Sequence, residues 1–477
     1  MSEHTSASRQ PGRSTVGRRG SLAGAAAVAA SATATAFAGP AAAAAAGPRA
    51  DVLLIVTDDQ PKHTDWAISK TIDWLGGHGV TFTHGHAATP LCSPSRSAIF
   101  SGQHAHHHGV RNNAASHSLD QSTTVRRHLK QAGYRTGLFG KYLSSWALED
   151  NPPHFEEWAL LQPGFTNARW NIDGTVQQLP GYTTDVIKNK TLAFLDKAAT
   201  DTRPRFAYVT PYASHEPNTP AAKYAETPVP AWTGRPSAPE DDRSDKPGYV
   251  RNATATLADA KELRRRQLRA LLSVDDAVQA IHDKLEALGQ LENTLVLYVA
   301  DNSYTWADHG WLKKSVPCSP AHEVPFYPSW PAAGLGSGTT DSRIVANIDI
   351  APTILDAAGI TPGTPQDGRS LLTPAARDHL LVQWWKQGTS GTGPKTGSRP
   401  VPATPRTVRP GTSASGWPPT SVRLPAEHAP GRCRAAALGT ARARERVRPG
   451  GRRAGRGGSR RTGCATAGVS RGSRSPG

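Results

Sequence analysis

The stretch Val52–Asp59, VLLIVTDD, decides the fold. Its first six residues are apolar almost throughout and rich in β-branched side chains, a pattern typical of a strand that is buried on both faces. Such strands belong to sheets with helices on both sides. The acidic pair Asp58-Asp59 would lie at the carboxyl end of the strand, where open α/β sheets bind their ligands.

Three more apolar runs end in polar residues in the same way. They are Arg135–Phe139 leading to Gly140-Lys141, Phe206–Thr210 leading five residues later to His215, and Leu295–Ala300 (LVLYVA) leading to Asp301-Asn302. Because the carboxyl ends of parallel strands meet at one edge of a sheet, we expect these polar groups to form a single site.

Helical patterns alternate with these runs. We expect helices at Gln121–Ala132, Thr183–Ala198, Ala258–Leu288 and Ala351–Ala358. The alternation predicts an α/β fold over about residues 49–385. Residues 217–250 are rich in Pro, Asp and Ser and are interpreted as a long surface loop that could face a substrate.

A second stretch, LCSPSRSAIFSG at 91–102, predicts a reactive anion site. It carries the signals of a helix, namely a capping residue, a proline for the first turn and a terminating glycine, at Ser93, Pro94 and Gly102. Cys92 would precede the helix, where backbone N–H groups and the dipole favour negative charge. Arg96, one turn further on, can point back at the same spot.

The polar pairs that end two of the runs suit a hard metal ion. Asp58, Asp59, Asp301 and Asn302 offer oxygen ligands, which fit Ca²⁺ or Mg²⁺ better than zinc. Helix capping is the alternative role for such residues. The histidines at 104 and 106–108 lack a second group of ligands at zinc spacing, so we interpret them as loop structure.

The charge of the chain is concentrated at one end. The 477 residues carry a formal net charge of +17, but residues 391–477 hold 17 Arg and one Lys against two Glu. The remainder has 37 basic and 36 acidic residues, so its charge indicates no specific nucleic-acid partner. The four cysteines, Cys92, Cys318, Cys433 and Cys464, do not form a disulfide framework.

The two ends of the chain differ from its body. Residues 1–46 contain Arg18-Arg19 before a long Ala-rich stretch and resemble a twin-arginine export signal, which predicts a secreted or extracytoplasmic protein. The stretch is too weakly apolar to predict a stable membrane span. Residues 388–477 show neither helix nor strand period, and we interpret them as disordered or as the product of a shifted reading frame.

The motif Cys92-x-Pro94-x-Arg96, followed by Ser101-Gly102, resembles the signature of the type I sulfatases. In that family the cysteine is converted to Cα-formylglycine, whose hydrated aldehyde is the nucleophile. The resemblance implies an alkaline-phosphatase-like fold, a large mixed sheet flanked by helices, with a catalytic domain at 47–387. The family's small C-terminal subdomain is not recognisable and is expected to be missing or frame-shifted.

The resemblance also implies a role for each candidate residue. A sulfate ester would be attacked by formylglycine-92 with the help of a divalent metal ion and of the neighbouring basic side chains. A formylglycine-generating enzyme would first convert Cys92 in the chain. The implied metal ligands are Asp58, Asp59, Cys92, Asp301 and Asn302, and the cation is Ca²⁺, with Mg²⁺ as the alternative. Arg96, Lys141 and Lys314 would stabilise the sulfuryl oxygens, and His215, with Lys314, would assist the departing alcohol. Lys313 is adjacent, so this assignment could shift by one residue.

Two segments depart from the common family pattern. Leu143 stands where many sulfatases have a histidine, in a Gly-Lys-Tyr-Leu version that resembles the N-acetylglucosamine-6-sulfatase and extracellular heparan-sulfatase branch. Ser244–Pro247 points to the same branch. Cys318-Ser319 replaces the usual Tyr-Glu.

The expected activity is hydrolysis of sulfate esters on a sulfated small molecule or carbohydrate. A phosphate or phosphonate monoester hydrolase of the same superfamily is the first alternative, because the same cations suit phosphate. An inactive, basic protein that binds anions through residues 391–477 is the second.

Overall fold

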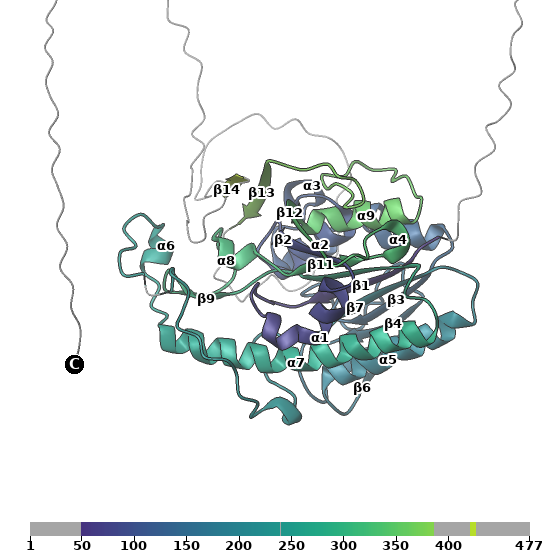
Figure 1. The fold of residues 1–477 in the computed structure, drawn as a ribbon, viewed down its shortest axis with the longest axis horizontal. Coiled ribbons are helices and arrows are strands. Elements are labelled where there is room, and N and C mark those ends of the chain that lie inside the picture. Colours follow the sequence, from purple (N-terminus) through teal and green to yellow (C-terminus); the bar gives the residue numbers. More distant parts are fainter. Residues whose placement is uncertain (1–48, 239, 386–419, 426–477) are drawn as a thin grey trace, which may run out of the picture. The chain divides into compact units, whose positions relative to one another are not determined.

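The computed structural model describes residues 49–238, 240–385 and 420–425, and the predicted export signal lies outside them. Their centre is an eight-stranded sheet with the strand order β11-β8-β1-β7-β3-β4-β5-β6 (Figure 1). The five strands from β8 to β4 run parallel, and β11, β5 and β6 are antiparallel to their neighbours. The predicted α/β fold with a large mixed sheet is confirmed.

The elements have the following bounds. The strands of the large sheet are β1 (Asp51–Thr57), β3 (Arg135–Gly140), β4 (Glu157–Leu161), β5 (Arg169–Ile172), β6 (Thr175–Gln178), β7 (Arg205–Thr210), β8 (Thr294–Ala300) and β11 (Phe326–Ser329). The helices are α1 (Ser69–Thr71), α2 (Cys92–Ser101), α3 (Ala105–His108), α4 (Val125–Gln131), α5 (Thr183–Ala199), α6 (Gly248–Arg251), α7 (Leu257–Ala287), α8 (Ser319–His322) and α9 (Ile350–Ala357).

Helices cover both faces of the sheet because its strands are apolar on both faces. In β1, Val52 and Leu54 pack into one core with side chains of α2, α4 and α9. Leu53 and Ile55 pack into the opposite core with α5 and α7. The two layers lie above and below the sheet in Figure 1. This two-sided burial is what a continuous apolar run requires.

Within the described part of the chain, three two-stranded sheets lie outside the large one. They pair β2 (Val80–His86) with β12 (Thr339–Ala346), β9 (Thr305–Asp308) with β10 (Trp311–Lys313), and β13 (His379–Trp384) with β14 (Thr420–Pro425). The last pair is antiparallel. The sequence showed no strand period after residue 388, so β14 corrects that expectation for its six residues, while the rest of this part of the chain lies outside the described residues.

The predicted helices are confirmed to within two residues at most ends, but the first turn of α2 is corrected. Ser93 was expected to cap this helix, whereas Leu91 is the N-cap and Cys92 is the first helical residue. The Ser93 hydroxyl instead bonds to the carbonyl oxygen of Ser144 at 3.3 Å. Gly102 ends the helix with φ 69°, as predicted.

Two further segments differ in detail from the sequence expectations. Residues 105–108 of the histidine run form the short helix α3 and not a loop. The segment 217–250 is irregular, as predicted, except for one helical turn at Ala222–Tyr224 and the start of α6. No helix among the described residues combines the length and the apolar character needed to cross a bilayer.

Candidate active site

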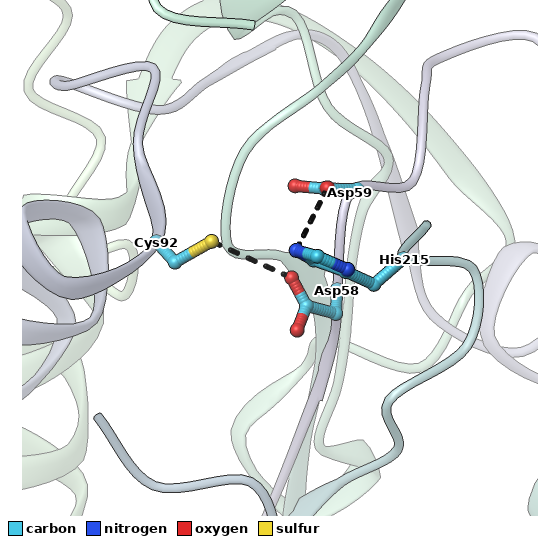
Figure 2. Close-up of side chains that lie close together, drawn as sticks. All are labelled: Asp58, Asp59, Cys92 and His215. Carbon is cyan, nitrogen blue, oxygen red and sulfur yellow. Dashed lines mark hydrogen bonds and ion pairs between the residues drawn. The ribbon is translucent and has the colours of Figure 1, made fainter. Parts of the chain in front are cut away.

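The carboxyl ends of four adjacent strands bring the predicted residues together. Asp58 and Asp59 follow β1, Lys141 follows β3, and Asp301 follows β8. His215 lies five residues after β7. Figure 2 shows Cys92 from α2 and His215 pointing toward Asp58 and Asp59. The prediction that one edge of the sheet gathers these groups is therefore met by the structure.

Cys92 lies at the centre of this arrangement. Its side chain is free of disulfides, and the residue is 1% exposed. The Lys314 ammonium donates to its Sγ at 2.9 Å, and Asp58 Oδ1 lies 3.7 Å from Sγ. Because Cys92 begins α2, it also lies at the positive end of the helix dipole. A nucleophile here would be buried beside both a cation and a carboxylate.

Two lysines, of which Lys141 is buried and Lys314 largely so, pair with the two aspartates. Lys141 Nζ bonds to Asp58, and Lys314 Nζ bonds to Asp59. Burial opposes the charge of Lys141, but Asp58 raises the pKa of this lysine above its ordinary value. Lys314 shows the same direction, because burial of its charge is outweighed by Asp59. Both lysines are therefore cations in this site.

The carboxyl group of Asp58 is held ionised in return. Burial alone would raise its pKa, but Lys141, His215 and Arg96 together hold the pKa below its ordinary value. Its Oδ2 also lies 3.7 Å from Arg96 Nη2. The site is therefore a compact set of fixed opposite charges from which water is largely excluded.

His215 is the exposed member of the group, with its side chain 26% accessible. Its Nδ1 lies 2.8 Å from the carbonyl oxygen of Glu216, and its Nε2 lies 3.6 Å from Asp59 Oδ2. Burial opposes the charge of the imidazole, but Asp59 and Asp58 outweigh it and raise the pKa of His215 to about 9. A histidine with this pKa carries a proton at neutral pH.

Some oxygen atoms suited to a cation accept no hydrogen bond. Among the described residues, Asp59 Oδ2 and Asn302 Oδ1 are buried and accept no hydrogen bond. Asp58, Asp59, Cys92 and His215 offer ligand atoms within 4.8 Å of one another. Buried oxygens without a donor are costly unless something occupies them, so this donor set fits a hard divalent cation.

Asp301 has a different environment from the other predicted ligands. Its Oδ2 accepts from Arg96 Nε at 2.8 Å, and its Oδ1 accepts from the backbone N–H groups of Asp59 and Asn302. All of these bonds orient neighbouring groups. In this structure Asp301 therefore organises the site, and a ligand role for it stays a prediction.

A model of the sulfatase family matches residues 50–360. The chain belongs to the sulfatase family. Among its relatives, the extracellular sulfatase Sulf-1 homolog of Caenorhabditis elegans is 33% identical over 347 residues, which cover 68% of this chain and 48% of that protein. The human N-acetylglucosamine-6-sulfatase is 29% identical over 387 residues, 72% of this chain and 69% of that protein. The predicted family and branch are confirmed.

A solved structure with the same fold was determined in complex with its substrate D-glucosamine-2-N,6-O-disulfate. The TM-score is 0.63 at 21% identity, covering 71% of this chain and 84% of the other. At this identity the likeness shows the fold. The chain spans about half the length of the Caenorhabditis elegans relative, so whole-protein properties of that relative do not transfer directly.

Two residues that the sequence did not reveal hold the sulfatase-motif arginine. Arg96 Nη1 donates to the Thr210 hydroxyl at 2.6 Å and to the Tyr208 hydroxyl at 3.0 Å. Both belong to β7, whose sequence looks like any buried strand, so only the strand register relative to α2 reveals their role. Arg96 Nη2 has no hydrogen-bond partner among the described residues.

The sulfatase-family departures also have structural consequences. Leu143 is buried in the core beside α2 and supplies no ionisable group. Cys318 packs with Val316 and Ala321 and is disulfide-bonded. The two neighbouring lysines have different contacts. Lys314 reaches Cys92, whereas Lys313 Nζ is 3.8 Å from the exposed Glu216.

Proposed function

We propose that the protein hydrolyses sulfate esters of saccharides, with 6-sulfated glucosamine units as the substrate class. The observation that carries this proposal is the position of Cys92, buried at the start of α2 between Lys314 and Asp58. The name of the human relative, N-acetylglucosamine-6-sulfatase, supports the substrate class.

Cys92 is the proposed source of the nucleophile, after conversion to formylglycine by a generating enzyme. Formylglycine supplies a hydrated aldehyde, one hydroxyl of which can attack sulfur in a covalent mechanism. Asp58 Oδ1, 3.7 Å from Sγ, is placed to accept a proton from a hydroxyl at this position.

The surrounding cations would stabilise charge on the sulfuryl oxygens. Arg96 Nη2 makes no hydrogen bond among the described residues, and Lys141 and Lys314 are held as cations. Fixed donors in a buried site stabilise developing charge because they need no reorganisation during the reaction.

His215 is the proposed acid for the departing alcohol. It is the most exposed of the converging groups, so it can face the leaving group, and Glu216 orients its ring through Nδ1. A protonated imidazole in this position can donate its proton to the departing alcohol.

A divalent cation, Ca²⁺ or alternatively Mg²⁺, would be held by Asp58, Asp59 and Asn302, with Cys92 and Asp301 as the remaining predicted ligands. The bound ion would supply Lewis-acid neutralisation of the ester's charge. The unpartnered oxygens of Asp59 and Asn302 support this assignment. Export to an extracytoplasmic compartment through residues 1–46 belongs to the same proposal.

The first test is mass spectrometry of the peptide that contains Cys92, from protein made in its native host, together with kcat/KM for aryl sulfate and aryl phosphate. We expect an aldehyde in place of the thiol and a strong preference for sulfate, both lost in Cys92→Ala. An unmodified thiol in protein that is nevertheless active would contradict the proposed nucleophile. A preference for phosphate would instead favour the phosphomonoesterase alternative.

A further inference from the structure

A cavity of about 220 Å³ lies next to the segments that carry the candidate metal ligands. Lys62 and His63 line it and follow Asp58-Asp59 in the chain. Ser303 also lines it and comes directly after Asn302 in the chain. None of the roles proposed above uses this cavity.

The irregular segment 217–250 supplies another wall of the cavity. In this wall, the side chain of Arg235 is held in place by its neighbours. Arg235 Nη1 bonds to Asp308 Oδ2 at 3.2 Å, and its guanidinium lies 4.6 Å above the centre of the Trp306 ring. Asp308 is itself held by the Ser237 hydroxyl at 2.5 Å. A guanidinium has five N–H donors, so this pairing leaves donors for a second oxyanion.

Charged side chains of both signs line the cavity, and Asp308 pairs with Arg235 next to it. Of the lining residues that the structure describes, Lys62 and Arg235 are cations and Glu323 is the carboxylate. The pKa of His63 is lowered, first by burial and then by Arg235 and Lys62, whose effect exceeds the opposing one of Asp65 and Glu323.

The remaining polar groups suit a saccharide. The hydroxyls of Ser237, Ser303 and Ser319 line the cavity, and the Glu323 carboxylate can accept from a sugar hydroxyl. Small-molecule sites combine largely apolar walls with a few such groups.

We propose that this cavity binds a second anionic group, a sulfate or a carboxylate, on the saccharide that carries the ester to be cleaved. The proposal rests on the proposed sulfatase function and deepens it, because it makes the enzyme selective for saccharides with two anionic groups. Arg235 and Lys62 are the specificity-determining residues.

The experiment compares wild type with Arg235→Gln on three substrates. They are glucosamine 6-sulfate, its 2-N,6-O-disulfate, and 6-sulfated glucosamine linked to a uronic acid. We expect the variant to lose roughly tenfold or more in kcat/KM on whichever doubly anionic substrate uses the cavity, as loss of a charge-assisted hydrogen bond requires. The singly charged substrate should change less than about twofold. Which of the two doubly anionic substrates loses activity shows whether the cavity binds a second sulfate or a carboxylate.

Arg264→Gln is the matched control. Arg264 also lies against Trp306, 5.6 Å from the ring centre, but it is not among the residues that line the cavity. The Arg264→Gln variant should leave the ratio of kcat/KM between the doubly and singly anionic substrates unchanged. Lys62→Gln is the second variant and takes the place of Arg235→Gln should that protein unfold.

Two results would overturn the proposal. One is an equal loss on all three substrates, which would make Arg235 merely structural. The other is a ratio of kcat/KM between the doubly and singly anionic substrates that is unchanged in both Arg235→Gln and Lys62→Gln. Binding of the disulfate and of the monosulfate is measured in parallel by calorimetry. If the protein hydrolyses neither ester, the proposed function is wrong. The ratio of the two binding affinities, compared between wild type and the variants, still tests the cavity.

Discussion

The surroundings of Arg96 determine which of its N–H donors are available to a ligand. It is fully buried, and its Nε and Nη1 atoms are occupied by Asp301, Tyr208 and Thr210, which leaves Nη2 directed toward Asp58. The planar fork of a guanidinium makes this division of donors possible, and a lysine could not reproduce it. The motif predicted the arginine, whereas its partners on β7 required the tertiary structure.

The histidine run has a role in stability that the sequence did not indicate. His108 is buried, and its Nδ1 accepts from the Val110 backbone N–H at 3.2 Å. Burial lowers the pKa of His108 to about 3, so its neutral form is the one that the folded state holds.

We therefore predict that His108 makes the protein less stable in acid. An unfolded histidine titrates near 6.5, so between about pH 6.5 and 3 the unfolded state binds the additional proton. The free energy of unfolding should fall by up to about 1.4 kcal/mol per pH unit from this residue as the pH drops. Urea unfolding at pH 7, 6 and 5 measures the slope.

His108→Gln should flatten that slope relative to wild type. His107→Gln is the control, because the His107 side chain is exposed and pairs with Asp367 at the surface. Identical slopes for wild type and His108→Gln would show that His108 does not carry the effect.

At the scale of elements, the β9–β10 hairpin explains how Lys314 enters the site. Lys313 and Ser315, on either side of it, have φ values of 96° and 65°. Three bonds fix this left-handed turn, from Thr305 Oγ1 to the Lys313 carbonyl at 2.7 Å, from Ser315 N to the Pro90 carbonyl at 3.0 Å, and from Trp311 Nε1 to the Lys314 carbonyl at 3.3 Å.

Trp311→Phe should release one of these bonds while keeping an aromatic ring. We predict a drop in kcat of roughly threefold to tenfold with KM nearly unchanged, because the lost bond, worth about 1 kcal/mol, orients a group that acts on the transition state. Steady-state kinetics on an aryl sulfate measures the two constants separately.

Trp158→Phe provides the comparison. It removes an indole N–H that donates to Asn171 at 2.9 Å, in β4, away from the hairpin. If both variants lose stability equally and neither changes kcat, Trp311 does not position Lys314.

Element boundaries also show where prediction from sequence ends. The apolar runs predicted the central strands because burial on both faces leaves a local pattern. The predicted start of α2 was wrong by two residues, because the Ser93 hydroxyl does not cap the helix but bonds to Ser144, 51 residues away. Similarly, Lys313 and Lys314 could be separated only by a turn that depends on Pro90 and Thr305. Long-range hydrogen bonds leave no periodic signal.

Across the whole molecule, the candidate cation site joins the two central strands β1 and β8. Asp58-Asp59 and Asp301-Asn302 end these paired strands. An ion that binds here should stabilise the native state, because the unfolded chain does not hold the two pairs together.

We predict that Ca²⁺ at 100 times its Kd raises the free energy of unfolding by about 2.7 kcal/mol, reversed by a chelator. Thermal unfolding with and without Ca²⁺ measures the shift. Asn302→Ala should reduce it, while Asp283→Asn, in an exposed group on α7, should not. An unfolding temperature that is indifferent to both Ca²⁺ and chelator would contradict a cation in this site.

The burial of Cys92 has a consequence for timing during synthesis. β1 pairs with β7 and β8, so the centre of the sheet is complete only when residues 294–300 have left the ribosome. At usual rates of translation, this is roughly 10–40 s after Cys92 itself emerges. In the finished fold the residue is 1% exposed and covered by groups from both halves of the chain. An enzyme that modifies this side chain must therefore act within that interval or on a reopened chain, and a protein exported in folded form must be modified before it leaves the cytoplasm.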